Sequence, residues 1–420
     1  MQKTASGGAA DHRPTLTPRR LNRATLARQL LLRREPMTVP DAVRRIVAVQ
    51  AQEPASPYLA LWNRLVGFDP ADLDTAFADR VVVRSTLLRG TLHAVHAGDW
   101  PAFHTAMAPF LRSARLDDLR FAAAGLTVAD ADALLPHLAT FLARPRTGVE
   151  IQEMLASRLA DRSDPTDQSQ PGGESPPGDQ SQPGGRPVPG DRHKWLWWAL
   201  RTYAPMHHVP TGGPWSYRIP ASFVAAPDPL DAPAHADSVR SLVLRYLAGF
   251  GPASARDIAQ FSLLRTPVLR QAVDALGDRV VRLTGPDGAP LFDVPGAPLP
   301  PEETPAPPRL LPMWDSVLLG YADRSRVVPP EYRTVITRRN GDVLPTLLVD
   351  GRVAGVWRPT PAGVEATAFH RLDEATWEGL AAEARAMVGF LAGRDPAAYR
   401  RYGHWWDKGL PGVEVRVLPG

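Results

Sequence analysis

Residues 237–294 narrow the choice of fold more than any other stretch of the chain. They contain three successive stretches whose apolar residues recur at helical spacing: 237–251, 254–262 and 267–276. Ser254 is typical of a helix N-cap, and Pro267 is typical of the first turn of a helix. Two strand-like stretches then flank a Pro-Asp-Gly turn within residues 279–294. Three helices followed by a hairpin is the order of a winged helix-turn-helix, so we predict one such unit here.

The same order of elements occurs twice more, nearer the N-terminus. The first copy has helical stretches and then two β-branched strands around Arg89-Gly90, at residues 21–34, 38–48, 56–65, 71–80 and 81–96. The second has three helical stretches and strand-like residues at 126–143, 149–159, 193–204, 206–210 and 215–220. No sequence identity links the three copies, so the repeat rests on the order of elements alone.

We therefore predict an α+β fold of three tandem winged helix-turn-helix units followed by a β-rich C-terminal domain with a terminal helix. The Asn340-Gly341 and Asp350-Gly351 pairs predict hairpins in that last domain. A Pro/Gly/Ser/Gln-rich insertion with two copies of DQSQPGG predicts disorder over 163–190. The expected boundaries are a disordered tail at 1–15, units at 16–125, 126–235 and 236–295, and the C-terminal domain at 309–420.

Charge and composition limit the classes of function. Basic residues exceed acidic ones by 48 to 44, and lysine occurs only at positions 3, 194 and 408, so 45 of the 48 are arginines. Arginine suits phosphates and base edges, although codon bias in a GC-rich genome also explains the excess. Absence of cysteine excludes disulfides, thiolate chemistry and cysteine-based zinc sites. No stretch is apolar enough to span a membrane, and the N-terminus is polar, so we expect a cytoplasmic protein.

Common enzyme signatures are missing from the sequence. The histidines are scattered and form no metal-binding motif such as H-E-x-x-H, and no phosphate loop, dinucleotide fingerprint or G-x-S-x-G elbow occurs. We therefore expect no metal and no cofactor. A DNA-binding regulator without catalytic activity remains an alternative at this point.

Two hairpins carry candidate DNA-binding residues. In the first, alternation along a strand places Arg89, Thr91 and His93 on one side, and Arg84 lies on the preceding strand. These side chains suit contacts to phosphate, and the alternative is an exposed polar strand face. The second hairpin carries a run of polar residues at its tip, namely Arg338, Arg339 and Asn340. This run suits a groove or backbone contact, although exposed turns are commonly charged.

The stretch VQAQEP, residues 49–54, places Gln50 and Gln52 at the predicted end of the helix 38–48. Glutamine is neither an acid nor a base at neutral pH, and burying its amide without partners is costly. One interpretation is a helix C-terminus whose glutamines bond to the backbone. The other is a pair of functional amides, and the residues alone leave both open.

Several stretches together resemble the winged-helix DNA glycosylases of the AlkZ/YcaQ type. They are VQAQEP, SPYLALWNRL, STLLRGTLHAVHAGDW, LLPMWDSVLLGYADRSRVVPP and NGDVLPTLLVDGRVAGVW. The resemblance covers the chain from about residue 16 apart from the insertion, and it implies three tandem winged helices that form a concave DNA-binding surface. The family motif of Gln, an apolar residue and then Gln or Asp corresponds to Gln50-Ala51-Gln52, where alanine is smaller than the usual aliphatic residue. The family's DNA-contacting hairpin corresponds to Arg338, Arg339 and Asn340.

The resemblance implies excision of N7-alkylated purines, including bulky adducts and interstrand crosslinks, from double-stranded DNA. Alkylation at N7 makes the purine cationic, so the base leaves as a neutral molecule without a strong general acid. Two neutral amides, Gln50 and Gln52, then suffice to orient a water and stabilise the developing sugar cation. No lysine presents itself for Schiff-base chemistry, so we expect simple hydrolysis that leaves an abasic site.

We further expect a monomer that associates with the nucleoid through DNA. Two alternatives stay open on the sequence. One is a non-catalytic winged-helix DNA-binding protein or transcriptional regulator, and the other is a family member that has lost its activity.

Overall fold

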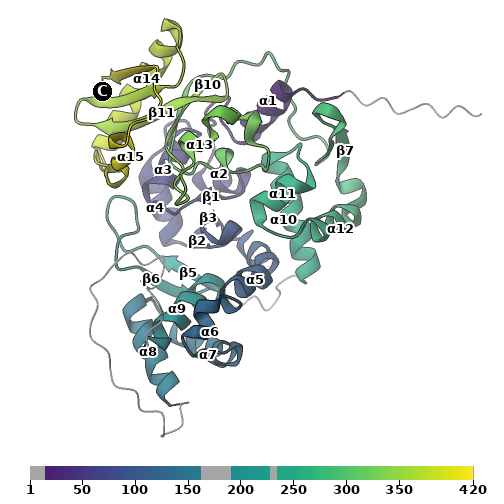
Figure 1. Cartoon of the computed structure of the whole chain (residues 1–420), viewed down its shortest axis with the longest axis vertical. Coiled ribbons are helices and arrows are strands. Elements are labelled where there is room, and N and C mark those ends of the chain that lie inside the picture. Colours follow the sequence, from purple (N-terminus) through teal and green to yellow (C-terminus); the bar gives the residue numbers. More distant parts are fainter. Residues whose placement is uncertain (1–14, 162–190, 228–233, 420) are drawn as a thin grey trace, which may run out of the picture.

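The structure is a computed structural model that describes residues 15–161, 191–227 and 234–419 (Figure 1). The predicted disordered insertion, 163–190, and nearly all of the predicted tail lie outside the described residues. Thr15, at the start of the described chain, forms a bridge with Thr284. The described chain is a mixture of helices and antiparallel sheets, which confirms the α+β class.

Three segments share one order of elements: helix, strand, helix, helix, strand, strand. Segment 1 (39–96) contains α2 (Val39–Arg45), β1 (Val49–Gln50), α3 (Ala55–Trp62), α4 (Pro70–Ala78), β2 (Val82–Thr86) and β3 (Leu92–His96). Segment 2 (128–225) contains α7 (Val128–Phe141), β4 (Arg146–Thr147), α8 (Gly148–Ala160), α9 (Arg192–Tyr203), β5 (Met206–Val209) and β6 (Ser222–Ala225). Segment 3 (235–293) contains α10 (His235–Phe250), a single bridging residue Ala253, α11 (Ala255–Ser262), α12 (Thr266–Leu276), β7 (Val281–Thr284) and β8 (Pro290–Asp293).

The strand pairing is also the same in the three segments. The first strand always pairs antiparallel with the last, as β1 with β3, β4 with β6, and Ala253 with Phe292 of β8. Segments 1 and 2 join their strands into one six-stranded sheet of order β1-β3-β2-β5-β6-β4, through the pairing of Arg84 with His208. Strand β1 is therefore an edge of this sheet. Figure 1 shows segment 2 at the bottom of the molecule and segment 3 at the right.

Two successive helices between segments 1 and 2 were not predicted from the sequence, α5 (Trp100–Leu116) and α6 (Leu119–Ala123). Helix α5 buries Phe103, Met107 and Leu111 and packs between α9 and α10, so it connects segments 2 and 3. Pro109 lies inside this helix and disguises its pattern, because proline normally interrupts a helix.

The C-terminal region contains a five-stranded antiparallel sheet of order β13-β12-β11-β10-β9. Its elements are β9 (Arg309–Leu311), α13 (Arg333–Ile336), β10 (Thr346–Val349), β11 (Arg352–Thr360), β12 (Gly363–Ala368), α14 (Glu374–Ala392), α15 (His404–Asp407) and β13 (Glu414–Leu418). Asp350 and Gly351 have φ angles of 46° and 77° in the tight turn from β10 to β11, which confirms that predicted hairpin. The other predicted hairpin is wrong in part, because the residues before Asn340 form the short helix α13 and one bridge, Thr337 with Val343.

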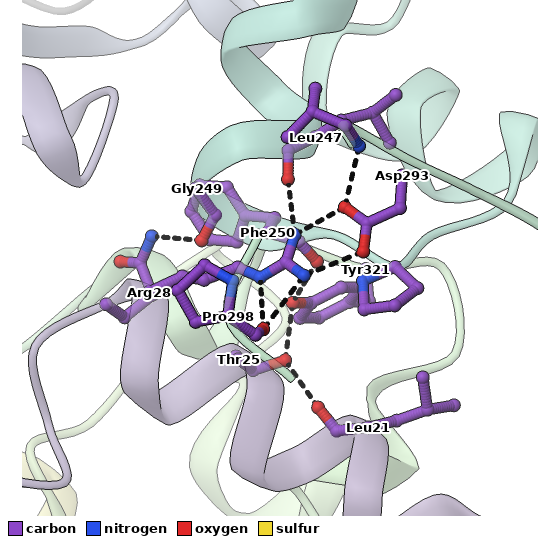
Figure 2. A network of polar contacts seen from close by, with 12 residues as sticks. Leu21, Thr25, Arg28, Leu247, Gly249, Phe250, Asp293, Pro298 and Tyr321 are labelled. Carbon is purple, nitrogen blue, oxygen red and sulfur yellow. Dashed lines mark hydrogen bonds and ion pairs between the residues drawn. The ribbon is translucent and has the colours of Figure 1, made fainter. Parts of the chain in front are cut away.

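Helix α1 (Pro18–Arg28) ties segment 3 to the rest of the chain through a buried ion pair (Figure 2). The guanidinium of Arg28 donates to both carboxylate oxygens of Asp293 at 2.6 and 2.7 Å, and to the carbonyl oxygens of Leu247 and Pro298. Thr25, one turn earlier, contacts the hydroxyl of Tyr321 at 2.7 Å. Each buried charge has its partners, so the contact fixes α1 against segment 3.

The motif residues lie where two hydrophobic cores meet. Val49 and Ala51 belong to the core shared by segment 1 and the C-terminal region, whereas Val47 and Ala48 belong to the core of α5 and segments 2 and 3. A chain that crosses from one core to the other within two residues has little freedom to move. The fold thus places Gln50 at a rigid junction.

Candidate active site

Gln50 lies on a strand, and the predicted helix end is wrong. Helix α2 ends at Arg45, and Gln50 is the last residue of β1, paired with His93 of β3. The side chain is only 3% exposed. Its interpretation as a helix C-terminus that bonds to the backbone is therefore excluded, and the question becomes which groups satisfy the amide.

Both ends of the Gln50 amide are held by the first hairpin. Its Oε1 accepts a hydrogen bond from Nη2 of Arg89 at 2.7 Å, and its Nε2 donates to Oγ1 of Thr91 at 3.1 Å. The Thr91 hydroxyl donates in turn to the carbonyl of Leu88 at 3.1 Å. Since arginine can only donate, the orientation of the amide is determined. One oxygen lone pair and one N–H of the amide have no partner in the described part of the chain.

Arg89 is positioned by an unusual backbone and by the end of a helix. Its φ of 56° lies in the left-handed region, which is costly for a residue with a side chain and occurs here in the tight turn between β2 and β3. Its Nη1 donates to the carbonyl of Phe261 at 3.1 Å, in the last turn of α11. That end of a helix carries unpaired carbonyls and partial negative charge, so it stabilises a cation.

His93 is fully buried and neutral. Its Nδ1 is 3.0 Å from the carbonyl of Thr91, so Nδ1 carries the proton and Nε2 accepts from Nη2 of Arg89 at 3.1 Å. Burial, and next the charge of Arg89, lower the pKa of His93 to about 3. His93 therefore holds Arg89 in place and has no proton to donate from a cationic form at neutral pH.

Gln52 differs from Gln50 because its side chain is exposed. Its Oε1 is 3.5 Å from the backbone N of Leu92, which is a weak contact. The residue between the two glutamines is firmly held, since the N–H of Ala51 donates to the carbonyl of Leu92 at 2.8 Å. The loop is thus fixed while the Gln52 amide stays free to bind another molecule.

Glu53 is a neighbour of the motif that the sequence reasoning missed. Its carboxylate accepts from Nη2 of Arg401 at 2.6 Å and from the hydroxyl of Tyr402 at 3.2 Å. These contacts tie the motif loop to the C-terminal region. The signal in the sequence was its charge directly beside Gln52.

Arg84 is 7% exposed, and in the described part of the chain its side chain forms no hydrogen bond to Arg89, Thr91 or His93. Its Nε donates to the carbonyl of Ala51 at 3.1 Å, and its guanidinium lies over the ring of Tyr217 at 4.5 Å. Burial lowers the pKa of Arg84 to about 10. The exposed polar strand face, which was the alternative for this hairpin, is therefore wrong: Arg84 and His93 are buried, and Arg89 and Thr91 are half-buried.

The second predicted DNA-contacting turn is not joined to Gln50 by any contact in the described part of the chain. Arg339 and Asn340 are exposed, and the amide of Asn340 donates to the carboxylate of Asp342 at 3.0 Å. Arg338 instead lies over the ring of Trp405 at 4.9 Å. The turn therefore presents two polar side chains to solvent and holds the third against the C-terminal region.

Two further findings bear on the type of site. Within residues 15–161, 191–227 and 234–419, no group of three or more His, Asp or Glu side chains is placed to hold a metal ion. No helix in the same ranges is long and apolar enough to cross a membrane.

Comparisons with known proteins agree on one family. The family model described as "DNA glycosylase AlkZ-like" matches residues 43–390, well over half of the chain. The interstrand DNA cross-link repair glycosylase of Streptomyces sahachiroi is 24% identical over 362 residues, which cover 82% of this chain and 88% of that protein. The solved structure of the Streptomyces sahachiroi DNA glycosylase AlkZ has the same fold, with a TM-score of 0.70 and 22% identity over 89% of this chain and 96% of that one. The chain belongs to the AlkZ-like family of DNA glycosylases, enzymes that hydrolyse N-glycosidic bonds.

Proposed function

We propose that this glycosylase removes N7-alkylated purines from double-stranded DNA, with Gln50 and Gln52 as the catalytic residues. The reaction is hydrolysis of the N-glycosidic bond, with water as the nucleophile and an abasic site as the product. Bulky adducts and interstrand crosslinks belong to the proposed substrates. The last point draws on the relative from Streptomyces sahachiroi, which is named an interstrand DNA cross-link repair glycosylase.

The observation that carries this proposal is an oriented amide with no acid beside it. Gln50 is held between Arg89 and Thr91, His93 is neutral, and the carboxylate of Glu53 is engaged by Arg401. A site of this kind suits a leaving group that needs no protonation. An N7-alkylpurine is such a group, because it is cationic before the bond breaks.

The two glutamines have different tasks in this proposal. Gln50, which is almost entirely buried, offers one free lone pair and one free N–H and orients a single water. Gln52 is exposed and supplies a carbonyl oxygen that stabilises the developing sugar cation. Fixed amides serve this purpose well, since they need no reorganisation during the reaction.

The positions of the lysines support hydrolysis without strand cleavage. Lys194 on α9 pairs with Asp191 at 2.8 Å, and Lys408 lies over the ring of Trp405 at 4.5 Å. Lys3 lies outside the described residues. In the described chain, therefore, neither lysine contacts the glutamine motif, and we assign no Schiff-base step to the enzyme.

We also propose that segments 1, 2 and 3 are winged helix-turn-helix units that together bind duplex DNA as a monomer. Their shared order of elements and strand pairing support this assignment. Of the first hairpin, Arg89 and Thr91 keep exposed surface for DNA, while burial gives Arg84 and His93 the task of supporting the motif. At the second turn, the exposed Arg339 and Asn340 contact the DNA backbone, and Arg338 joins them only if it leaves Trp405.

A duplex with one N7-methylguanine tests the proposal. We expect wild type to produce alkali-labile abasic sites at the lesion, with no strand break before alkali treatment. A Gln50→Ala, Gln52→Ala double variant should leave the lesion intact. A crosslinked duplex tests the bulky substrate in the same assay. Intact DNA with wild type on both substrates would overturn the proposal and leave a DNA-binding role.

A further inference from the structure

Two half-buried arginines, Arg89 and Arg324, have no carboxylate partner in the described part of the chain. Arg89 bonds to Gln50, His93 and Phe261, all of them neutral groups. Arg324 donates from Nη1 to the hydroxyl of Thr337 at 3.3 Å, and its Nε is buried and has no partner in the described part of the chain. A cation that is partly removed from water is stabilised by an anion, and neither group forms an ion pair within the residues that the structure describes.

Helix α11 contacts both Arg89 and the residues just before Arg324. In its first turn, the carboxylate of Asp257 accepts a hydrogen bond from the N–H of Ala322 at 3.0 Å, two residues before Arg324. Its last turn accepts Arg89 through the carbonyl of Phe261. Asp257 and Phe261 are one helical turn apart, about 6 Å along the axis. Helix α11 therefore brings the backbone just before Arg324, in the C-terminal region, near Arg89 of segment 1.

The electrostatics agree with this placement. Burial, and next the charge of Arg324, lower the pKa of Arg89 to about 10. Arg324 itself has its pKa lowered by burial and by Arg333. Two neighbouring positive charges attract an anion, and arginine forms strong charge-assisted hydrogen bonds to phosphate oxygens.

We propose that Arg89 and Arg324 form a clamp for one phosphodiester group of the DNA backbone beside Gln50. Arg89 has two N–H groups left for a phosphate oxygen after its three neutral contacts, and the two terminal nitrogens of Arg324 have three N–H groups left after the bond to Thr337 in the described part of the chain. Held there, the phosphate sets the distance between the sugar of the lesion and the Gln50 amide. It also neutralises cationic charge that would otherwise oppose a developing sugar cation. The inference rests on the proposed function for the position of the lesion.

Binding of an undamaged, fluorescently labelled duplex, measured by anisotropy over a range of KCl concentrations, tests the clamp. One phosphate contact contributes about 0.9 to the slope of log affinity against log salt concentration. We expect Arg324→Ala to lower that slope by about 0.9 and to weaken binding about tenfold at low salt. Arg324→Lys keeps a point charge, so it should retain most of the slope.

Arg385→Ala is the matched control, because Arg385 is an exposed arginine of α14 with no contact to the motif. It should leave the slope unchanged, and near-identical melting temperatures would show that all variants are folded. An unchanged slope for folded Arg324→Ala, or an equal loss for Arg385→Ala, would overturn the clamp. Undamaged DNA makes this result independent of glycosylase activity, so a failed clamp and a failed proposed function remain distinguishable.

Discussion

Segments 1 and 3 have the same order of elements but connect their first strand to their second helix in different ways. In segment 3, Ser254 caps α11 and Asp257 completes a reciprocal capping box. Segment 2 does the same for α8 with Thr147 and Glu150. In segment 1 the equivalent stretch is Gln-Ala-Gln-Glu-Pro, and α3 begins at Ala55 with Pro54 as its N-cap residue and no side-chain cap.

Segments 2 and 3 use the residues before their second helix to stabilise that helix, whereas segment 1 does not. A cap is worth about 1 kcal/mol, and segment 1 does without it. The polar side chains before α3 bond to other groups instead of capping the helix: Gln50 bonds to Arg89, and Glu53 bonds to Arg401. A local rule that holds in two segments and fails in the third supports the proposed catalytic role of the motif in segment 1.

The largest effect on stability is expected in segment 3, at its anchor to α1. Asp293→Ala leaves the buried guanidinium of Arg28 without its anion, and should lower the free energy of unfolding by about 3–5 kcal/mol. Urea denaturation measures this loss. A loss below about 1 kcal/mol would show that the carbonyls of Leu247 and Pro298 suffice to hold the charge.

The next effect concerns pH and lies in segment 1. His93 has a folded pKa of about 3 against about 6.5 when unfolded, so the unfolded chain binds more protons between these values and stability falls as the pH falls below 6.5. From pH 7.5 to pH 5 this residue should remove about 2 kcal/mol. Denaturation of wild type and His93→Asn at both pH values isolates the contribution of His93 to the free energy of unfolding, since the other buried histidines contribute equally to both proteins. Equal pH dependence in the two proteins would contradict the assignment.

A smaller effect is expected at the cap of segment 3. Ser254→Ala removes the side chain that accepts from the N–H of Asp257 at 3.2 Å, and should cost about 1 kcal/mol of unfolding free energy. Glycosylase activity should stay within about twofold of wild type, because this cap is not part of the motif. Thermal unfolding and excision assays on the same preparation measure both quantities, and a large loss of activity at full stability would undermine the division between the segments.

The smallest effect on stability is expected at Gln52, although the expected loss of activity is large. An exposed side chain with one 3.5 Å contact should change the unfolding free energy by less than about 0.5 kcal/mol when replaced by alanine. Excision should nevertheless fall about tenfold, which corresponds to about 1.4 kcal/mol of transition-state stabilisation. Wild-type excision rates in Gln52→Ala would remove Gln52 from the catalytic pair.

Much of the fold was predictable because local signals agreed with it. The capped helices of segment 3 and the Asp350-Gly351 turn have strong, short-range signatures, and the structure has both. Helix α5 was missed because Pro109 interrupts its pattern. Strand β1 was missed because two residues carry too little periodicity, and its pairing partner His93 lies 43 positions further along the chain.

The candidate site was predictable in its residues but not in its geometry. Alternation grouped Arg89, Thr91 and His93, and the structure brings all three to Gln50 or its neighbours. Their burial was not predictable, since it depends on α11 and Phe261, about 170 residues away. The sequence did not place Arg324 near Arg89, because the backbone just before Arg324 is held by the contact of Ala322 with Asp257, 65 residues away.

The most direct test of the catalytic role of segment 1 is single-turnover excision of N7-methylguanine by wild type and Gln50→Ala at saturating enzyme. Saturation removes differences in DNA binding, and Gln152→Ala on α8 serves as a matched glutamine control. The expected result is a rate at least about 100-fold lower for Gln50→Ala, or about 2.7 kcal/mol, with Gln152→Ala unchanged. A Gln50→Ala rate within about twofold of wild type would contradict a catalytic role for the amide.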